Sequence, residues 1–196
     1  MFIPNIEQYK IILASQSPRR HYLLKEIGVE FEFKLKHFID ESYPENLVKE
    51  EIPKYIAQKK ALKYGALEPN EILITADTIV WLNDKVVQKP KDEDDAVRIL
   101  KELSGNCHQV YTGVCIKSRE KEVVFSACTD VYFKKLTFAE IDYYIKHYQP
   151  LDKAGAYGIQ EWIGYIGVEK INGSFFNVMG LPIQKLYTEL DDFIND

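Results

Sequence analysis

The feature that most constrains the fold is a nearly continuous apolar run, Ile72 to Leu82, made almost entirely of residues that favour β-strands. Other segments alternate between the two-residue period of strands and the 3.6-residue period of helices. The expected strands are residues 11–14, 31–35, 85–88, 107–117 and 123–135, and the expected helices follow Pro18 and Pro182 and cover residues 47–67, 92–103 and 138–148. Strands that alternate with helices, together with a hairpin around residues 118–121, predict a mixed α/β sheet with helices around it.

Composition and charge narrow the class of protein. The chain has 196 residues, 46% hydrophobic and 28% charged, which fits one compact domain or two small lobes sharing a core. A net charge of -5 argues against binding of nucleic-acid polymers. Cys107, Cys115 and Cys128 form no C-x-x-C pair, which favours a reducing cytoplasm over a disulfide framework. No apolar run approaches the roughly 18 residues of a membrane span, and no leader pattern opens the chain.

A basic helix start follows the first strand. In Ala14-Ser15-Gln16-Ser17-Pro18-Arg19-Arg20, a serine can cap the helix and Pro18 occupies its first turn. Arg19 and Arg20 then add positive charge where free N–H groups already carry it, which is unfavourable unless an anion joins them. A phosphate would fit this site, but the two arginines could equally point into water or pair with nearby carboxylates.

A single acidic residue, Asp77, interrupts the long apolar run. Aspartate is depleted in strands and its charge is costly to bury, so Asp77 needs a cation, a metal or several donors beside it. A buried carboxylate with a raised pKa could act as a general base, and one beside Mg²⁺ could be a ligand. Alternatively, the strand ends at Ala76 and Asp77 starts a turn.

Other polar positions carry weaker signals. By default Asp40 and Glu41 form an exposed acidic pair, which would bind a hard cation only if it folds near Asp77. Lys60 is by default a solvated charge on the 47–67 helix, and Lys89, at a strand end before a proline, could reach a cleft or solvent. The spacing of the histidines does not fit a metal site; they are His21, His37, His108 and His147. The chain has neither a Walker loop nor a G-x-G-x-x-G motif.

An ordered set of short motifs resembles the Maf family, and it covers residues 11–190 almost without interruption. The motifs are residues 13–20 (Leu-Ala-Ser-Gln-Ser-Pro-Arg-Arg), 76–78 (Ala-Asp-Thr), 89–90 (Lys-Pro), 103–105 (Leu-Ser-Gly), His108, 110–114 (Val-Tyr-Thr-Gly-Val), 152–160 (Asp-Lys-Ala-Gly-Ala-Tyr-Gly-Ile-Gln), 172–174 (Asn-Gly-Ser) and 177–182 (Asn-Val-Met-Gly-Leu-Pro). Each motif is short, but their order is highly specific.

The resemblance implies a nucleoside triphosphate pyrophosphatase, which converts NTP and water into NMP and pyrophosphate with a divalent metal, Mg²⁺ or Mn²⁺. It also implies an inosine-triphosphate-pyrophosphatase-like fold. In that fold an elongated mixed sheet flanked by helices forms two lobes with a central cleft, within a single domain over residues 1–196. Family members often form homodimers, so a second copy of the chain is an expected partner.

The resemblance further implies roles for individual residues. It places the general base on Asp77 and metal ligation on Asp77 or Glu41. Phosphate contacts fall on Ser15, Arg20, Lys60 and Lys89, with Arg19 beside them, and base recognition falls on Arg20, Thr78 and Gln160.

Arg19, Thr78 and Gln160 resemble the branch that acts on dTTP and UTP rather than the branch that acts on 7-methyl-GTP. An amide both donates and accepts, so Gln160 can pair with a uracil or thymine edge that presents C=O and N–H. Glu161 departs from the glycine common in the family and could narrow the base pocket. Two alternatives stay open: a non-catalytic nucleotide-binding regulator of cell division, and a pyrophosphatase for another nucleotide such as 7-methyl-GTP.

Overall fold

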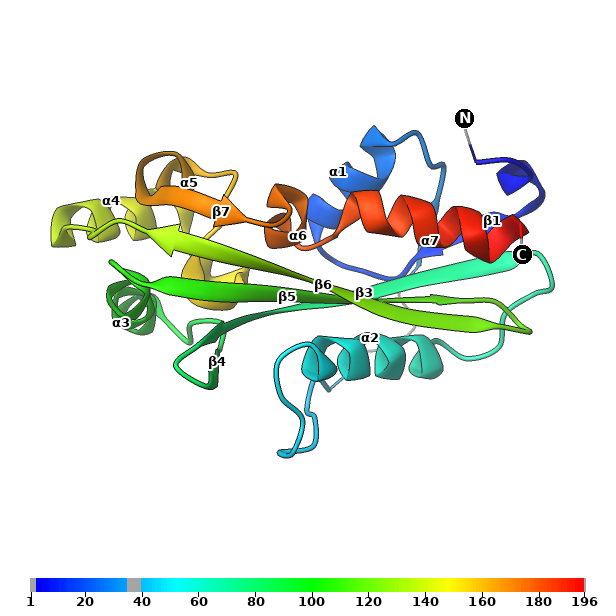
Figure 1. Ribbon diagram of the computed structural model, residues 1–196, viewed down its shortest axis with the longest axis horizontal. Helices are drawn as coiled ribbons and strands as arrows, with labels where there is room; N and C mark the ends of the chain where they lie inside the picture. Colours follow the sequence, from blue (N-terminus) through cyan, green and yellow to red (C-terminus); the bar gives the residue numbers. More distant parts are fainter. Residues whose placement is uncertain (1–2, 35–39, 196) are drawn as a thin grey trace. The chain divides into compact units, whose positions relative to one another are not determined.

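A computed structural model describes residues 3–34 and 40–195 of the chain (Figure 1). Its strands are β1 (Lys10–Leu13), β2 (Glu32–Phe33), β3 (Glu71–Leu82), β4 (Lys85–Val87), β5 (Cys107–Lys117), β6 (Glu122–Phe133) and β7 (Val168–Asn172). Its α-helices are α1 (Pro18–Glu26), α2 (Glu51–Tyr64), α3 (Glu93–Leu103), α4 (Phe138–Tyr148), α5 (Trp162–Gly167), α6 (Phe175–Met179) and α7 (Ile183–Asn195). Short 3₁₀ turns are η1 (Ile6–Gln8), η2 (Pro150–Asp152) and η3 (Ala154–Ala156).

Within the described residues, seven strands form one mixed sheet. The order is β2-β1-β3-β5-β6-β7, and β4 pairs with β3 outside this path. β1 is parallel to both neighbours, with Ile12 opposite Glu32 on one side and Leu73 on the other. β3 is antiparallel to β4, and β6 is antiparallel to β7. The expected mixed α/β sheet with flanking helices is therefore confirmed.

The region after Gly158 differs most from expectation. It contains α5, β7 and α6, none of which the sequence pattern predicted. These elements have six, five and five residues, which is too short for a helical or strand period to stand out. The 47–67 helix begins only at Glu51, because Lys49 has a φ of 50°, outside the helical range. The 31–35 strand is confirmed only at β2, and Leu35 lies outside the described residues.

The described chain divides into two compact units. Unit 1 comprises Met1–Asp77, Thr112–Ala127 and Gly180–Asp196, and unit 2 comprises Thr78–Tyr111 and Cys128–Met179. The division falls inside the long strands β3, β5 and β6, so each strand contributes residues to both units. Two lobes were expected and two units are present, whereas a cleft between them stays a prediction.

In unit 1, helices cover both faces of the sheet. α2 lies on one face, and α1 and α7 lie on the other (Figure 1). Ala57 and Ala61 of α2 are four residues apart and fully buried, and they pack against side chains from several strands. The residues that share this core with them are Ile12, Tyr64, Leu67, Leu73 and Cys115. Small alanines allow α2 to lie close to the sheet. Lys60, which precedes Ala61 on the helix, therefore lies near β3.

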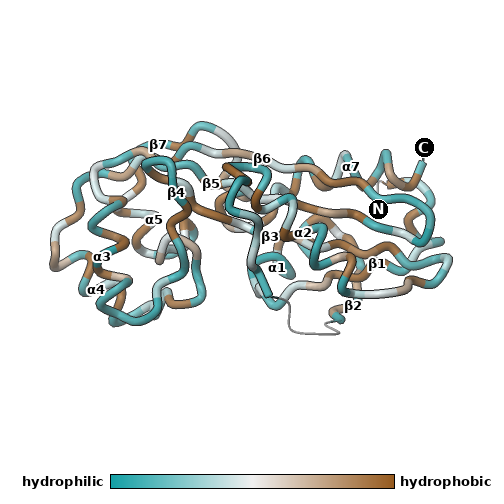
Figure 2. The backbone as a smooth tube through the Cα atoms, turned by 90° about the horizontal axis from the view of Figure 1, so that it is seen from below, coloured by the Kyte–Doolittle hydropathy of each residue, from teal (hydrophilic) through white to brown (hydrophobic). Residues whose placement is uncertain are grey.

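Unit 2 contains amphipathic helices and a cluster of buried aromatic rings. Hydrophilic and hydrophobic residues alternate along α3 and α4 (Figure 2); in α3 the buried residues are Ala96, Ile99, Leu100 and Leu103, the spacing of one helical face. The buried His108 ring meets Phe133 and Tyr157 edge-on, with centroids 5.2 and 5.4 Å away. Burial lowers the pKa of His108 to about 3, so its ring is neutral at pH 7.

The other two described histidines, His21 and His147, belong to no group of three or more His, Cys, Asp or Glu side chains that could hold a metal ion among the described residues. His147 stacks on Tyr143 with centroids 4.1 Å apart, and His21 contacts Phe31 and Phe33. His37 lies outside the described residues. No helix in residues 3–34 or 40–195 has the length and apolar character that crossing a membrane requires.

Candidate active site

Asp77 lies in the middle of β3, which continues to Leu82. The alternative that the strand ends at Ala76 is therefore wrong. Side chains alternate across a strand, so Thr75 and Asp77 point to the same face as Leu73, the face that α2 covers. The Thr75 hydroxyl donates to the Ala57 carbonyl of α2 over 2.7 Å, which fixes the helix against the strand. Asp77 is buried beside this contact.

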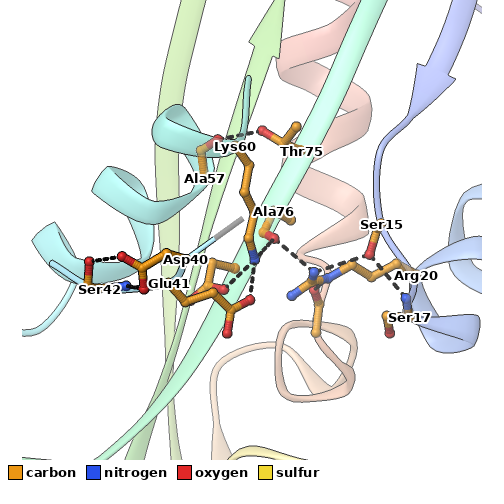
Figure 3. Close-up of polar contacts among 12 residues, drawn as sticks. Ser15, Ser17, Arg20, Asp40, Glu41, Ser42, Ala57, Lys60, Thr75 and Ala76 are labelled. Atoms are coloured by element: carbon orange, nitrogen blue, oxygen red, sulfur yellow. Dashed lines mark hydrogen bonds and ion pairs between the residues drawn. The ribbon is translucent and has the colours of Figure 1, made fainter. Parts of the chain in front are cut away.

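Lys60 supplies the cation that the buried Asp77 requires. Its Nζ lies 2.8 Å from Asp77 Oδ1 and 2.8 Å from Glu41 Oε1 (Figure 3). Only 14% of the Lys60 side chain and 10% of the Asp77 side chain are exposed. The default interpretation of Lys60 as a solvated helix charge is therefore wrong, because the closely packed α2 directs it to β3.

Two opposing effects act on the Asp77 carboxyl. Burial raises its pKa, because the ionised form loses its hydration. The Lys60 ammonium and, more weakly, the Arg20 guanidinium lower it, but burial dominates and the pKa of Asp77 stays above its ordinary value. A carboxylate with a raised pKa is a better proton acceptor than an exposed one, which suits a general base.

A short loop presents Glu41 to Lys60. The Asp40 carboxylate accepts hydrogen bonds from the Ser42 amide, over 3.0 Å, and from the Ser42 hydroxyl. Lys59 of α2 donates to the Ser42 carbonyl over 2.8 Å. Asp40 is thus engaged with Ser42 and with Lys59, whose Nζ lies 3.6 Å from its Oδ2, and Glu41 is the member of the acidic pair that lies near Asp77, through their common partner Lys60.

Arg20 donates hydrogen bonds to backbone carbonyls and also interacts electrostatically with the Asp77 and Glu41 carboxylates. Its Nε donates to the Gly180 carbonyl over 2.7 Å, and its Nη1 donates to the Ala76 carbonyl over 2.8 Å (Figure 3). The Ser15 hydroxyl accepts from Nη1 and from the Ser17 amide, each over 3.3 Å. Burial lowers the pKa of Arg20, but a guanidinium remains charged. Arg20 therefore interacts with carboxylates as well as with the backbone, and binding of a phosphate by the two arginines stays a prediction.

The structure brings together Ser15, Arg20, Glu41, Lys60 and Asp77 within unit 1. Arg19 lies in the same first turn of α1 as Arg20, and Ser17 is the N-cap residue of that helix. A free helix N-terminus, a serine hydroxyl and cationic side chains together favour an anion. The Asp77 and Glu41 oxygens meet on the Lys60 ammonium, which offsets part of their negative charge.

The remaining predicted residues belong to unit 2. Thr78 follows Asp77 on β3 and points to the opposite face of the sheet. Lys89 is exposed and follows β4. Gln160 lies in the turn before α5, and its side-chain Oε1 is buried without a hydrogen-bond partner among the described residues. A buried acceptor without a partner is uncommon in folded proteins, and a bound ligand is one source of the missing donor.

Sequence reasoning assigned no role to Lys59, Ser42 or the carbonyls of Ala76 and Gly180. Backbone carbonyls have no residue-type signal, so only the packed structure could identify the partners of Arg20. Lys59 directly precedes Lys60 in the sequence, and no residue pattern distinguishes its role.

Fold and site together define a mixed α/β protein whose sheet carries a buried carboxylate among cationic side chains. The chain belongs to the Maf family, because the family described as Maf-like protein matches residues 10–193.

Several relatives cover nearly the whole chain. A protein of Phocaeicola vulgatus named dTTP/UTP pyrophosphatase is 57% identical over 96% of this chain and 98% of its own. Proteins with the same name from Parabacteroides distasonis and Porphyromonas gingivalis are 55% and 49% identical over 97% of this chain, and over 100% and 98% of their own. A solved nucleoside-triphosphatase / dITP/XTP pyrophosphatase from Mycobacterium abscessus covers 94% of this chain and 96% of its own, at 13% identity and a TM-score of 0.41.

Proposed function

We propose that this chain is a nucleoside triphosphate pyrophosphatase that hydrolyses dTTP and UTP to the monophosphate and pyrophosphate. The observation that carries the proposal is the pairing of Lys60 with both Asp77 and Glu41, next to Arg20 and the start of α1. Relatives that are named dTTP/UTP pyrophosphatase and are aligned over nearly their full length support the choice of substrate.

In this proposal Asp77 takes a proton from the water that attacks the α-phosphorus, and pyrophosphate leaves. The raised pKa of Asp77 supports that role, because the carboxylate accepts a proton more readily. Arg19, Arg20, Ser15, Lys60 and Lys89 contact the triphosphate. Their contribution is positioning and neutralisation of charge, which dominate phosphoryl transfer.

A divalent metal, Mg²⁺ or Mn²⁺, fits the oxygen donors of Glu41 and Asp77. In the described part of the chain, no group of three or more His, Cys, Asp or Glu side chains could hold a metal ion, so in this proposal the substrate would supply further ligands. Mg²⁺ is commonly held by one or two carboxylates together with substrate phosphates. The metal would neutralise phosphate charge in the transition state.

Base recognition is proposed for Gln160, Thr78 and Arg20. The buried Oε1 of Gln160, which has no hydrogen-bond partner in residues 3–34 and 40–195, supports this role, because a uracil or thymine edge offers an N–H beside a carbonyl. We further infer a cytoplasmic location, a homodimer and a house-cleaning role that removes free nucleotides. The net charge of -5 supports a small nucleotide over a nucleic-acid polymer as the substrate.

A nucleotide panel tests the proposal directly. Purified chain is incubated with dTTP, UTP, CTP, GTP and 7-methyl-GTP, each with Mg²⁺ or Mn²⁺, and monophosphate and pyrophosphate are separated by ion-exchange chromatography. We expect dTTP and UTP to be the best substrates and both products to form in equal amounts. Asp77→Asn should lower kcat by roughly 10²- to 10⁴-fold while far-UV circular dichroism stays unchanged.

Other results would contradict the proposal in distinct ways. Release of a single phosphate would refute pyrophosphatase chemistry, and preference for 7-methyl-GTP would refute the assigned branch. Nucleotide binding with no turnover would favour the non-catalytic regulator.

A further inference from the structure

The turn that carries Gln160 is closed by a second set of polar side chains. The Glu161 amide donates to the Gly158 carbonyl over 3.0 Å, and the Gly158 amide donates to the Tyr144 hydroxyl over 3.0 Å. The Tyr144 hydroxyl in turn donates to the Glu161 carboxylate. One buried hydroxyl from α4 therefore joins the first and last residues of the turn 158–161.

A buried lysine holds the other side of the same carboxylate. Lys153 Nζ lies 3.3 Å from Glu161 Oε1 and 2.9 Å from Asp152 Oδ1, and only 9% of the Lys153 side chain is exposed. A buried ammonium needs nearby negative charge, so Glu161 is constrained by Lys153 and Tyr144 together. These residues all belong to unit 2.

Backbone packing leaves the turn little freedom to move. A Cβ atom on Gly164 of α5 would lie 1.8 Å from the Ile159 carbonyl oxygen, so the turn rests directly on the helix backbone. A Cβ atom on Gly158 would lie 2.7 Å from Cδ of Glu161, so this carboxylate covers the start of the turn. Gln160 is therefore attached to a segment fixed by hydrogen bonds, an ion pair and close contact.

We propose that Glu161 is a positioning residue for Gln160, acting with Lys153 and Tyr144 to hold the turn from which Gln160 presents its buried amide oxygen to the nucleobase. The inference rests on the proposed function and adds residues to it. A freely rotating glutamine amide could turn to match either uracil or cytosine, because these bases exchange donor and acceptor at N3 and C4. A fixed acceptor oxygen favours the N3–H of uracil or thymine and opposes the N3 lone pair of cytosine.

The test compares UTP with CTP in two variants that loosen the turn in different ways. Glu161→Ala removes the carboxylate, and Tyr144→Phe removes only the hydroxyl. We expect the ratio of kcat/KM for UTP to that for CTP to fall by roughly 10- to 100-fold in each, as misplacement of a positioning group produces. The change should lie in KM, with kcat for UTP nearly unchanged, because base contacts are made equally in the ground and transition states.

Matched controls remove the same groups elsewhere in unit 2. Glu169→Ala removes an exposed carboxylate on β7, and Tyr165→Phe removes an exposed hydroxyl on α5. Both should keep the wild-type ratio. Thermal melts of every variant show whether a change in the ratio accompanies a folded protein, and Tyr144→Phe, which changes one atom, tests the proposal if Glu161→Ala does not fold.

A double-variant comparison separates positioning from a general structural effect. In a Gln160→Ala background, Glu161→Ala should cause no further change in the UTP/CTP ratio, because its action passes through the missing side chain. An equal change with and without Gln160, or an unchanged ratio in both single variants, would overturn the inference.

Failure of the proposed function would be visible separately. If no nucleoside triphosphate is hydrolysed, titration calorimetry with UTP and CTP measures the same discrimination as a ratio of Kd values. A wild-type binding ratio in Glu161→Ala and Tyr144→Phe would then overturn the inference, and a ratio that falls in both but not in the Gln160→Ala background would support it.

Discussion

At the scale of single residues, the site depends on how strongly Lys60 offsets the burial of Asp77. The two charges are 2.8 Å apart and both side chains are mostly buried. Burial nevertheless prevails, and the pKa of Asp77 stays above its ordinary value. Replacing Lys60 should therefore shift the pKa of Asp77, and replacing Asp77 should remove its titration.

Lys60→Met should raise the pKa of Asp77 further, because the ionised carboxylate loses its nearest positive charge. The acid limb of the pH profile of kcat/KM for UTP should then shift to higher pH, in addition to a loss of activity from weaker phosphate contact. Lys63→Met, which removes an exposed lysine three residues further along α2, is the matched control. An acid limb at the wild-type pH would show that Asp77 does not govern it.

Asp77→Asn should make the folded protein more stable relative to wild type as pH rises. A folded-state pKa above the unfolded value means that Asp77 favours folding most below its unfolded pKa, about 4, and loses this contribution as pH rises through its folded pKa. Urea unfolding between pH 4 and pH 8 measures the difference between variant and wild type, with Asp84→Asn, in an exposed turn, as control. A difference that shrinks with rising pH would contradict the raised pKa.

Residue chemistry predicted part of this site. An aspartate in an apolar strand had to have a partner, and a cation is one of the partners that sequence reasoning allowed. Which cation it is depends on the distance between α2 and β3, which two alanines and the Thr75 hydroxyl set in space. The partners of Arg20 are carbonyls of residues distant in sequence, so no pattern of residue types could indicate them.

At the scale of elements, local signals explain which boundaries were predictable. α4 spans the expected residues because Thr137 and Glu140 form a reciprocal capping box at its start. β5 also matches, because Val110, Tyr111, Thr112, Val114 and Ile116 favour strands. In contrast, α5, β7 and α6 are short and depend on tertiary packing, as the contact of Gly164 with the Ile159 carbonyl illustrates.

Thr137→Ala should destabilise the protein by about 1 kcal/mol, the usual cost of losing an N-cap side chain. The Thr137 hydroxyl accepts from the Glu140 amide over 3.3 Å, and that bond disappears in the variant. Guanidinium unfolding monitored by circular dichroism measures the loss. Thr188→Ala in the exposed face of α7 should be nearly neutral, and an equal loss there would contradict a specific capping effect.

At the scale of the whole molecule, an acidic chain gathers cationic groups in one place. The net charge is -5, yet Arg20 of α1 and Lys60 of α2 both donate to the Ala76 carbonyl of β3, and Arg19 precedes Arg20. Net charge governs long-range attraction, whereas a local cluster governs what binds once it arrives. The two observations together favour a small polyanion.

Poly(U) should therefore fail to inhibit UTP hydrolysis at 0.15 M salt, when supplied at the same phosphate concentration as UTP. Tight binding of a polymer needs many basic contacts along its backbone, and this acidic surface opposes them. Pyrophosphate is the positive control, because it is small enough to occupy the triphosphate site. Strong inhibition by poly(U) would show that the local cluster continues into a longer basic track.

Among the described residues, the buried Oε1 of Gln160 has no hydrogen-bond partner, so a substrate base that donates an N–H can supply one. A buried acceptor without a partner costs about 1–3 kcal/mol. A base that donates an N–H to this oxygen forms a hydrogen bond with it. A base that presents a lone pair forms none and is repelled. Selectivity between the two kinds of base would then depend on a buried acceptor that the fold sets in place before any nucleotide binds.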